Sequence, residues 1–178
     1  MPGIDKVKLD KFRKGELKFV QIFNVDAKQI ASLLLAGHNF FVQGRFEEAS
    51  AIFEGLAVLD PKNPYVHNIL GAIYQQTQQY DKAILRYTLA LELFSNDVNA
   101  LTNRGEIYLN LGKFQDAAHD LKRAAELDPE KKHPSANRAR LLTSVVAERL
   151  RPAKRTVKKS QESHCQIKSR TAELSRSI

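Results

Sequence analysis

Cysteine is almost missing from this sequence and tryptophan is missing altogether, so that Cys165 is the one thiol. A single cysteine excludes an internal disulfide framework and fits a reducing compartment. No apolar run approaches the roughly 18–20 residues that span a bilayer, and residues 1–6 lack the apolar core of a secretory signal. We therefore expect a cytoplasmic protein without a membrane span.

Motifs for catalysis and for cofactor binding are also missing. The sequence contains no phosphate-binding glycine loop, no G-x-S-x-G and no H-E-x-x-H. His164 and Cys165 form the one adjacent Cys–His pair, and two ligands in a polar tail fall short of the four that a structural zinc site needs. We expect neither an enzyme nor a bound cofactor or metal.

The positive charge is concentrated in the C-terminal tail. The net charge is +8, but residues 151–178 hold eight basic and two acidic side chains, whereas residues 1–150 hold 20 and 18. A nucleic-acid-binding domain carries its positive charge on the folded surface, so we expect no specific nucleic-acid binding by the folded part. Residues 152–178 are rich in Ser, Lys, Arg and Gln and are predicted to be disordered. A tail that binds nucleic acid or another anionic surface stays open as an alternative.

A 34-residue period runs through the middle of the chain. Gly37, Gly71 and Gly105 are spaced by 34 residues, and units that place this glycine at position 8 begin at Ile30, Pro64 and Val98. The other shared positions are 11 (Phe40, Tyr74, Tyr108), 17 (Phe46, Tyr80, Phe114), 20 (Ala49, Ala83, Ala117), 24 (Phe53, Tyr87, Leu121), 30 (Leu59, Leu93, Leu127) and 32 (Pro61, Ser95, Pro129).

Each unit holds two apolar stretches of helical period separated by a turn, which predicts a helical hairpin. The small residues at positions 8 and 20 allow the two helices to approach closely, and large side chains at 11, 17 and 24 fill the space around that contact. A single hairpin cannot bury its own apolar face, so the core is expected to form by stacking of units.

The pattern G-x-x-[FY]-x5-[FY]-x2-A, followed by a bulky residue at position 24 and usually a proline at 32, resembles the tetratricopeptide repeat over residues 30–131. The resemblance implies an all-α protein, a right-handed α-solenoid of three hairpins at 30–63, 64–97 and 98–131. Gly44 and Gly112 match the glycine of the turn between helices, and we interpret Thr77 as its replacement in the second unit.

Two flanking segments extend the predicted solenoid. Residues 132–151 are expected to contain one capping helix over 134–150, with Ser135 as its N-cap and an apolar stripe of Leu141, Leu142, Val145, Val146 and Leu150. Residues 1–29 are expected to be a helical flank interrupted at Gly15. We favour an N-terminal cap, with a self-association or membrane-surface segment as the alternative.

The resemblance also implies a concave groove, lined by positions 2, 5, 9, 12 and 13 of the first helix of each unit. In this sequence those positions are Ala31, Leu34, His38, Phe41 and Val42 in the first unit, Tyr65, Asn68, Ala72, Gln75 and Gln76 in the second, and Asn99, Thr102, Glu106, Leu109 and Asn110 in the third. Leu34 and Phe41 could instead pack between units.

This groove composition argues against one branch of the family, which binds the acidic C-termini of heat-shock chaperones with a clamp of basic and amide side chains. The clamp positions hold Leu34, His38, Ile69, Asn99 and Asn103, with no lysine or arginine to receive a carboxylate. An apolar and amide groove suits an extended peptide with aliphatic anchors instead.

A narrower resemblance rests on the block from Gly44 to Asp60, on the leucine at position 27 (Leu56) and on the order of a short N-terminal helix, three repeats and one C-terminal helix. These features are similar to class II chaperones of type III secretion, which hold translocator proteins. The resemblance implies a non-catalytic chaperone or adaptor whose partner is a secreted translocator or effector, with a homodimer as an open possibility. The alternative is a general scaffold that assembles a larger complex.

Overall fold

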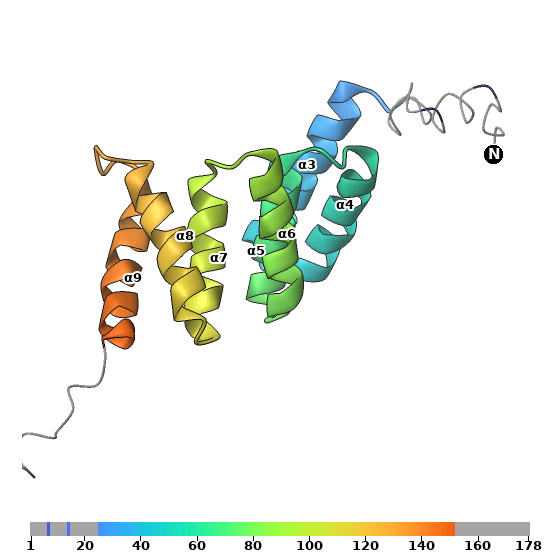
Figure 1. Cartoon of the computed structure of the whole chain (residues 1–178). Coiled ribbons are helices and arrows are strands. Elements are labelled where there is room, and N and C mark those ends of the chain that lie inside the picture. Colours follow the sequence, from blue (N-terminus) through green and yellow to red (C-terminus); the bar gives the residue numbers. More distant parts are fainter. Residues whose placement is uncertain (1–6, 8–13, 15–24, 152–178) are drawn as a thin grey trace, which may run out of the picture.

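The computed structural model describes residues 7, 14 and 25–151. Within 25–151 the chain forms helices, and the hairpins α3–α4, α5–α6 and α7–α8 follow one another across the molecule, with α9 at the end beyond α8 (Figure 1). The helices are α3 (Ala27–Val42), α4 (Phe46–Leu59), α5 (Pro64–Gln76), α6 (Tyr80–Leu93), α7 (Val98–Asn110), α8 (Phe114–Glu126) and α9 (Pro134–Leu150). The predicted all-α solenoid of three hairpins is confirmed. Most of the N-terminal flank and the whole basic tail after Arg151 lie outside the described residues.

The first helix of each hairpin begins at a side-chain cap. Asp26, Asn63 and Asp97 are the N-caps of α3, α5 and α7, and each accepts a backbone hydrogen bond from the first turn. The helices α5 and α7 therefore begin at the predicted unit starts, Pro64 and Val98. The helix α3 begins three residues before the first unit, because Asp26 and Gln29 form a reciprocal capping box there.

The turn inside each hairpin needs one residue in the left-handed region. That residue is Gly44 (φ 75°) in the first hairpin and Gly112 (φ 73°) in the third. In the second hairpin it is Gln78 (φ 59°), so the interpretation of Thr77 as the replacement was wrong by one position. The 34-residue period already indicates Gln78 as the turn residue, because Gln78 lies 34 residues after Gly44.

The small residue at position 8 is a packing requirement. A Cβ added to Gly71 would lie 2.7 Å from the Tyr87 ring, and one added to Gly37 would lie 2.8 Å from Phe53. Both distances are shorter than any normal carbon–carbon contact, so the residue at position 24 rests directly on the glycine backbone. This contact is the close helix–helix approach that the sequence predicted.

The apolar side chains form two clusters that meet at Tyr74. The first cluster joins α4 and α5, with partly buried side chains of α3 packed on it, and consists of Ala49, Phe53, Leu56, Ala57, Val66, Leu70 and Ile73. The second joins α6, α7, α8 and α9 around Tyr87, Leu101, Ile107 and Leu121. The solenoid is therefore held together by packing between successive helices and not by one central core.

Two ion pairs link neighbouring helices within the solenoid. Arg86 of α6 contacts Glu54 of α4 at 2.6 Å, and Tyr74 donates to the same carboxylate. Arg104 of α7 donates to both oxygens of the buried Asp120 on α8 at 2.7 and 2.9 Å. Burial lowers the pKa of Arg104, but the hydrogen bonds and charge of Asp120 outweigh that effect and leave the pKa raised. A guanidinium held in this way is a structural group and is not available to a ligand.

The last helix, α9, packs on α8 and α7 as the predicted C-terminal cap. Its N-cap is His133, whose Nδ1 accepts from the backbone nitrogen of Ser135, so the prediction of Ser135 as the cap was wrong. The predicted apolar stripe was wrong in part. The buried residues of α9 are Ala136, Ala139 and Val146, whereas Leu141 is 72% exposed. Ala136, Ala139 and Val146 share one side of α9 at helical spacing, and Leu141 lies on the opposite side.

Candidate functional site

We call the side of α3, α5 and α7 that carries unit positions 2, 5, 9, 12 and 13 the A-helix face. The structure leaves most of the predicted site residues accessible there. The exposed members are Ala31, His38, Val42, Tyr65, Gln76, Asn99 and Asn110, and the half-buried members are Leu34, Phe41, Asn68, Ala72, Gln75, Glu106 and Leu109. None of these residues lines the cavities of about 590, 370 and 360 Å³ that lie elsewhere on the solenoid.

Thr102 is the predicted site residue that the structure does not leave accessible. Its side chain is fully buried, and its hydroxyl donates to the carbonyl oxygens of Val98 (2.7 Å) and Ser135 (3.2 Å). The covering element is α9, whose first turn lies over this part of α7. A peptide on the A-helix face has no access to Thr102 while α9 is in place.

The α3–α5 end of the face is apolar and open. Val42 is 70% exposed and Leu35, on the same helix, is 63% exposed. Tyr65 is 45% exposed, and its hydroxyl lies 3.5 Å from Nδ1 of His38. Partial burial raises the pKa of Tyr65, so its hydroxyl is protonated and can donate near neutral pH. This end offers an aliphatic surface beside two polar atoms that can bond a peptide backbone.

Leu34 and Phe41 of α3 point into the solenoid, beneath the exposed side chains of this end. Both lie against the first apolar cluster, and the Phe41 ring is 6.0 Å from the ring of Phe46. Much of each of these two side chains is therefore used in packing between helices, which is the alternative that the sequence left open.

The amides in the middle of the face are already bonded to neighbouring helices. Asn68 donates to Asp97 at 2.7 Å. Gln75 accepts from the Tyr87 hydroxyl at 3.0 Å and donates to Glu106 at 3.5 Å. These contacts tie α5 to α6 and α7, so a ligand must share the amides with the solenoid or replace the existing bonds.

In the structure, side chains of α9 also contact the A-helix face, and the sequence did not predict these contacts. Arg138 of α9 donates to Oδ1 of Asn103 and lies 3.7 Å from the Glu106 carboxylate. The Ser135 hydroxyl donates to Oδ1 of Asn99 at 2.6 Å. A signal was present in the sequence, because Ala139 lies 34 residues after Gly105, and both residues are buried. The helix α9 thus occupies the place of the first helix of a fourth unit.

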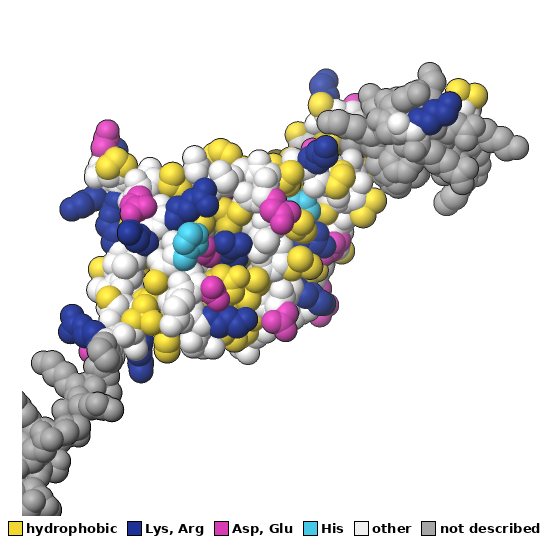
Figure 2. Space-filling model, viewed as in Figure 1, with side chains coloured by type: hydrophobic (Ala, Val, Ile, Leu, Met, Phe, Trp, Pro, Cys, Tyr) yellow, Lys and Arg dark blue, Asp and Glu magenta, His cyan; other side chains and the backbone are white. Residues whose placement is uncertain are grey.

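The surface of the solenoid carries no excess of either charge. Residues 25–151 contain 15 basic and 15 acidic side chains, and both signs are interspersed over the face drawn in Figure 2. The basic excess of the sequence therefore lies outside residues 25–151. No extended field of one sign is present on residues 25–151 to attract a polyanion.

Within the described residues, no group of three or more His, Cys, Asp or Glu side chains is arranged to hold a metal ion. In the same part of the chain, no helix has both the length and the apolar character that crossing a bilayer requires.

Several solved structures share the fold. A T3SS complex from Aeromonas hydrophila superimposes with a TM-score of 0.72 at 24% identity, covering 79% of this chain and 95% of that one. PcrH in complex with the chaperone-binding region of PopD gives 0.67 at 24% identity (70% and 96%). The first TPR domain of Spaghetti (RPAP3), bound to the HSP90 peptide SRMEEVD, gives 0.60 at 27% identity (69% and 97%).

Sequence comparison identifies the repeat directly. Hsp70-Hsp90 organizing protein 1 of Glycine max is 39% identical over 73 residues, which is 41% of this chain and 13% of that protein. The chain spans less than a third of the length of the curated relatives it matches. Two sequence profiles, both of the tetratricopeptide repeat, match residues 34–98 and 70–147. The chain belongs to the tetratricopeptide repeat family.

Proposed function

We propose that this chain is a non-catalytic chaperone or adaptor, which holds an extended peptide of a partner protein on the A-helix face. The observation that carries the proposal is the open apolar end of that face, where Val42 and Tyr65 are 70% and 45% exposed. An exposed apolar patch beside polar groups is typical of a protein-contact site. The function needs no cofactor or metal, and we place it in the cytoplasm.

The partner that fits this end is a segment with aliphatic anchors. Val42 and Tyr65 would contact the anchors, while the Tyr65 hydroxyl and His38 would bond the peptide backbone between them. The likeness to PcrH, whose structure contains the chaperone-binding region of PopD, supports a secreted translocator-like partner. Covering its apolar segment before export would keep such a partner soluble.

A carboxylate-ended peptide fits the face less well. Arg138 is the one arginine or lysine that the described contacts bring against the α7 part of the face, and it already contacts Asn103 and Glu106. A carboxylate there would meet the negative charge of Glu106 and would have to break the existing pair. The A-helix face therefore suits a peptide such as SRMEEVD, to which the first TPR domain of Spaghetti binds, less well than it suits an apolar segment.

The second candidate function is a scaffold that assembles a larger complex. The chain matches only a small part of each curated relative, so the match identifies a repeat module and not a whole activity. A scaffold would bind a folded surface with many weak contacts, whereas a chaperone binds one short extended segment.

Fluorescence anisotropy with two labelled peptides distinguishes these functions. One peptide is the chaperone-binding region of PopD and the other is SRMEEVD. The proposal expects the first to bind at least about tenfold more tightly, a free-energy difference of about 1.4 kcal/mol. Tighter binding of SRMEEVD would overturn the aliphatic-anchor proposal, and no binding of either peptide would favour the scaffold.

A further inference from the structure

The core of the second hairpin holds a hydroxyl that packing does not require. Position 24 of the three units is Phe53, Tyr87 and Leu121, and each of these side chains is fully buried. A Cβ added to Gly37 would lie 2.8 Å from Phe53, and one added to Gly105 would lie 2.8 Å from Leu121. An apolar side chain therefore fills this place as closely as tyrosine does. A buried hydroxyl without a partner costs free energy, so the partner of Tyr87 indicates what the hydroxyl does.

The partner of that hydroxyl is a residue of the A-helix face. Tyr87 donates to Oε1 of Gln75 at 3.0 Å, and Gln75 is half-buried on α5. Burial raises the pKa of Tyr87 well above its usual value, so the hydroxyl is protonated and can donate near neutral pH. Gln75 occupies unit position 12, which is Phe41 and Leu109 in the other two units. Polar side chains at both positions 12 and 24 are thus particular to the second unit.

Glu106 fixes the other end of the Gln75 amide. An ionised carboxylate only accepts hydrogen bonds, so the amide must turn Nε2 toward Glu106, at 3.5 Å, and Oε1 toward Tyr87. The contacts of the described residues use one N–H of Nε2 and leave the second. The amide held in this way offers a ligand a donor and not an acceptor.

We propose that Tyr87 is a positioning residue for peptide binding: its hydroxyl holds the Gln75 amide so that an N–H of Gln75 donates to a backbone carbonyl oxygen of the bound peptide. An extended peptide has no internal partners for its carbonyl groups, so each of them needs a donor on the face. A carboxylate side chain fits this donor less well, because it would lie beside the negative charge of Glu106. This inference rests on the proposed function and specifies how the middle of the face recognises its ligand.

Removing the hydroxyl tests its role. With the chaperone-binding region of PopD as the probe, Tyr87→Phe should weaken binding at least about fivefold, because the Gln75 amide is no longer held in one orientation. Tyr74→Phe is the matched control, since the Tyr74 hydroxyl donates to Glu54 on α4 and not to the A-helix face. Urea denaturation should show some loss of stability in both variants. Equal affinities of the two variants would overturn the proposal and leave the Tyr87 hydroxyl with a structural role alone.

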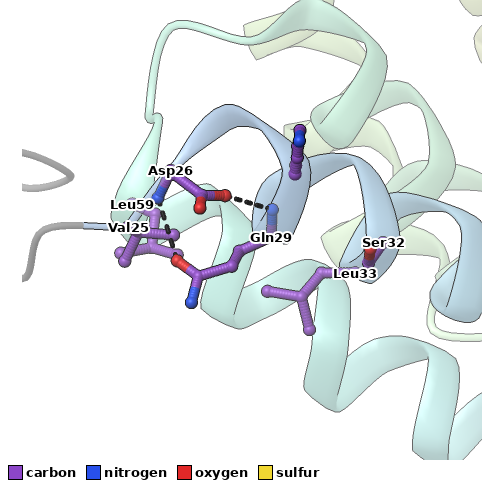
Figure 3. A pocket seen from close by; sticks show the side chains of 7 residues that line it. Val25, Asp26, Gln29, Ser32, Leu33 and Leu59 are labelled. Atoms are coloured by element: carbon purple, nitrogen blue, oxygen red, sulfur yellow. Dashed lines mark hydrogen bonds between the residues drawn. The ribbon is translucent and has the colours of Figure 1, made fainter.

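Two glutamines allow the donor itself to be tested. Gln75→Glu keeps an oxygen for the Tyr87 hydroxyl but replaces the N–H by a second acceptor, so binding should weaken at least about tenfold. The control is Gln29→Glu at the N-terminal edge of α3, where the Gln29 oxygen accepts from the backbone nitrogen of Asp26 beside the pocket of about 590 Å³ (Figure 3). This change adds the same charge and should leave the affinity unchanged. Equal affinities of these two variants would contradict the assignment of Gln75 as a donor.

A compensated variant separates the lost donor from the added charge. Gln75→Glu combined with Glu106→Gln keeps the net charge of the chain and exchanges donor and acceptor between the two side chains. Binding should remain at least about tenfold weaker than in the unchanged chain. Recovered affinity would show that charge, and not the N–H of Gln75, controls binding, and would overturn the proposal.

Peptides with single backbone esters identify the acceptor. An ester carbonyl accepts hydrogen bonds more weakly than an amide carbonyl, so one replacement should weaken binding to the unchanged chain more than binding to Tyr87→Phe. Equal effects on both chains at every position of the peptide would overturn recognition of the backbone. No binding of the PopD region by the unchanged chain would instead contradict the proposed function, and this inference with it.

Discussion

Asn68 Nδ2 donates to Asp97 Oδ2 at 2.7 Å, which joins the middle of α5 to the N-cap of α7. The other carboxylate oxygen accepts from the backbone nitrogens of Asn99 and Ala100, at 2.9 and 3.0 Å. One carboxylate thus both begins a helix and fixes its position against the preceding hairpin.

This relationship makes Asn68 a residue of the solenoid as well as of the A-helix face. We expect Asn68→Ala to lower the free energy of unfolding by about 1–2 kcal/mol, because the charged acceptor loses its donor. Gln76→Ala, an exposed amide on the same helix, is the control and should change stability by less than about 0.5 kcal/mol. Urea denaturation measures both, and equal effects would contradict the structural role of Asn68.

Two glycines in helices should respond to alanine in opposite directions. A Cβ on Gly71 would lie 2.7–2.9 Å from the buried Tyr87 ring, so Gly71→Ala should lower the free energy of unfolding by about 1–3 kcal/mol. Gly55 has no atom within 4 Å of an added Cβ, so Gly55→Ala should raise it by about 0.5–1 kcal/mol. Stabilisation by both substitutions would show that the hairpins are packed less closely than described.

The turn of the second hairpin holds a strained backbone conformation at Gln78, which glycine would relieve. Gln78 has φ 59° where the other turns have glycine, so Gln78→Gly should raise the free energy of unfolding by about 0.5–1 kcal/mol. The reciprocal change Gly112→Gln should lower it by a similar amount. Thermal unfolding followed by circular dichroism gives both values, and a loss of stability in Gln78→Gly would contradict the assignment of the turn.

Asp128 makes the loop before α9 sensitive to acid. Burial raises the pKa of this carboxyl, but hydrogen bonds from the backbone nitrogens of His133 and Lys132, and the Arg140 guanidinium, outweigh it and leave the pKa lowered. A lowered folded pKa contributes stability above the unfolded value of about 4 and loses it as the pH falls below that. Asp128→Asn should therefore lose stability at pH 7 and less, or none, at about pH 2. A loss of equal size at both pH values would contradict this origin.

The repeats themselves could be predicted from the sequence because their rules are local. A glycine at position 8 and a large residue at 24 must meet within one hairpin, as Gly71 and Tyr87 do. The first helices of the second and third units begin where the alignment placed them, since a capping residue precedes each.

The rest depends on contacts between hairpins, which a repeat pattern does not specify. The burial of Thr102 depends on the position of α9, and α9 begins two residues later than a fourth unit would because the loop before it is longer. The pairing of Arg138 with Glu106 follows from that same placement. A residue's place in the repeat therefore predicts its face, while the neighbouring helices decide whether it is available to a ligand.

The affinity of one peptide for two matched variants tests the central claim, that the open end of the A-helix face binds an apolar segment. Val42 and Leu85 are both exposed aliphatic residues, at 70% and 58%, on α3 and α6. With the chaperone-binding region of PopD as the probe, Val42→Asp should weaken binding at least about tenfold, through a charge placed on the apolar contact, whereas Leu85→Asp should leave it unchanged. Equal affinities for the two variants, or a loss confined to Leu85→Asp, would contradict the account.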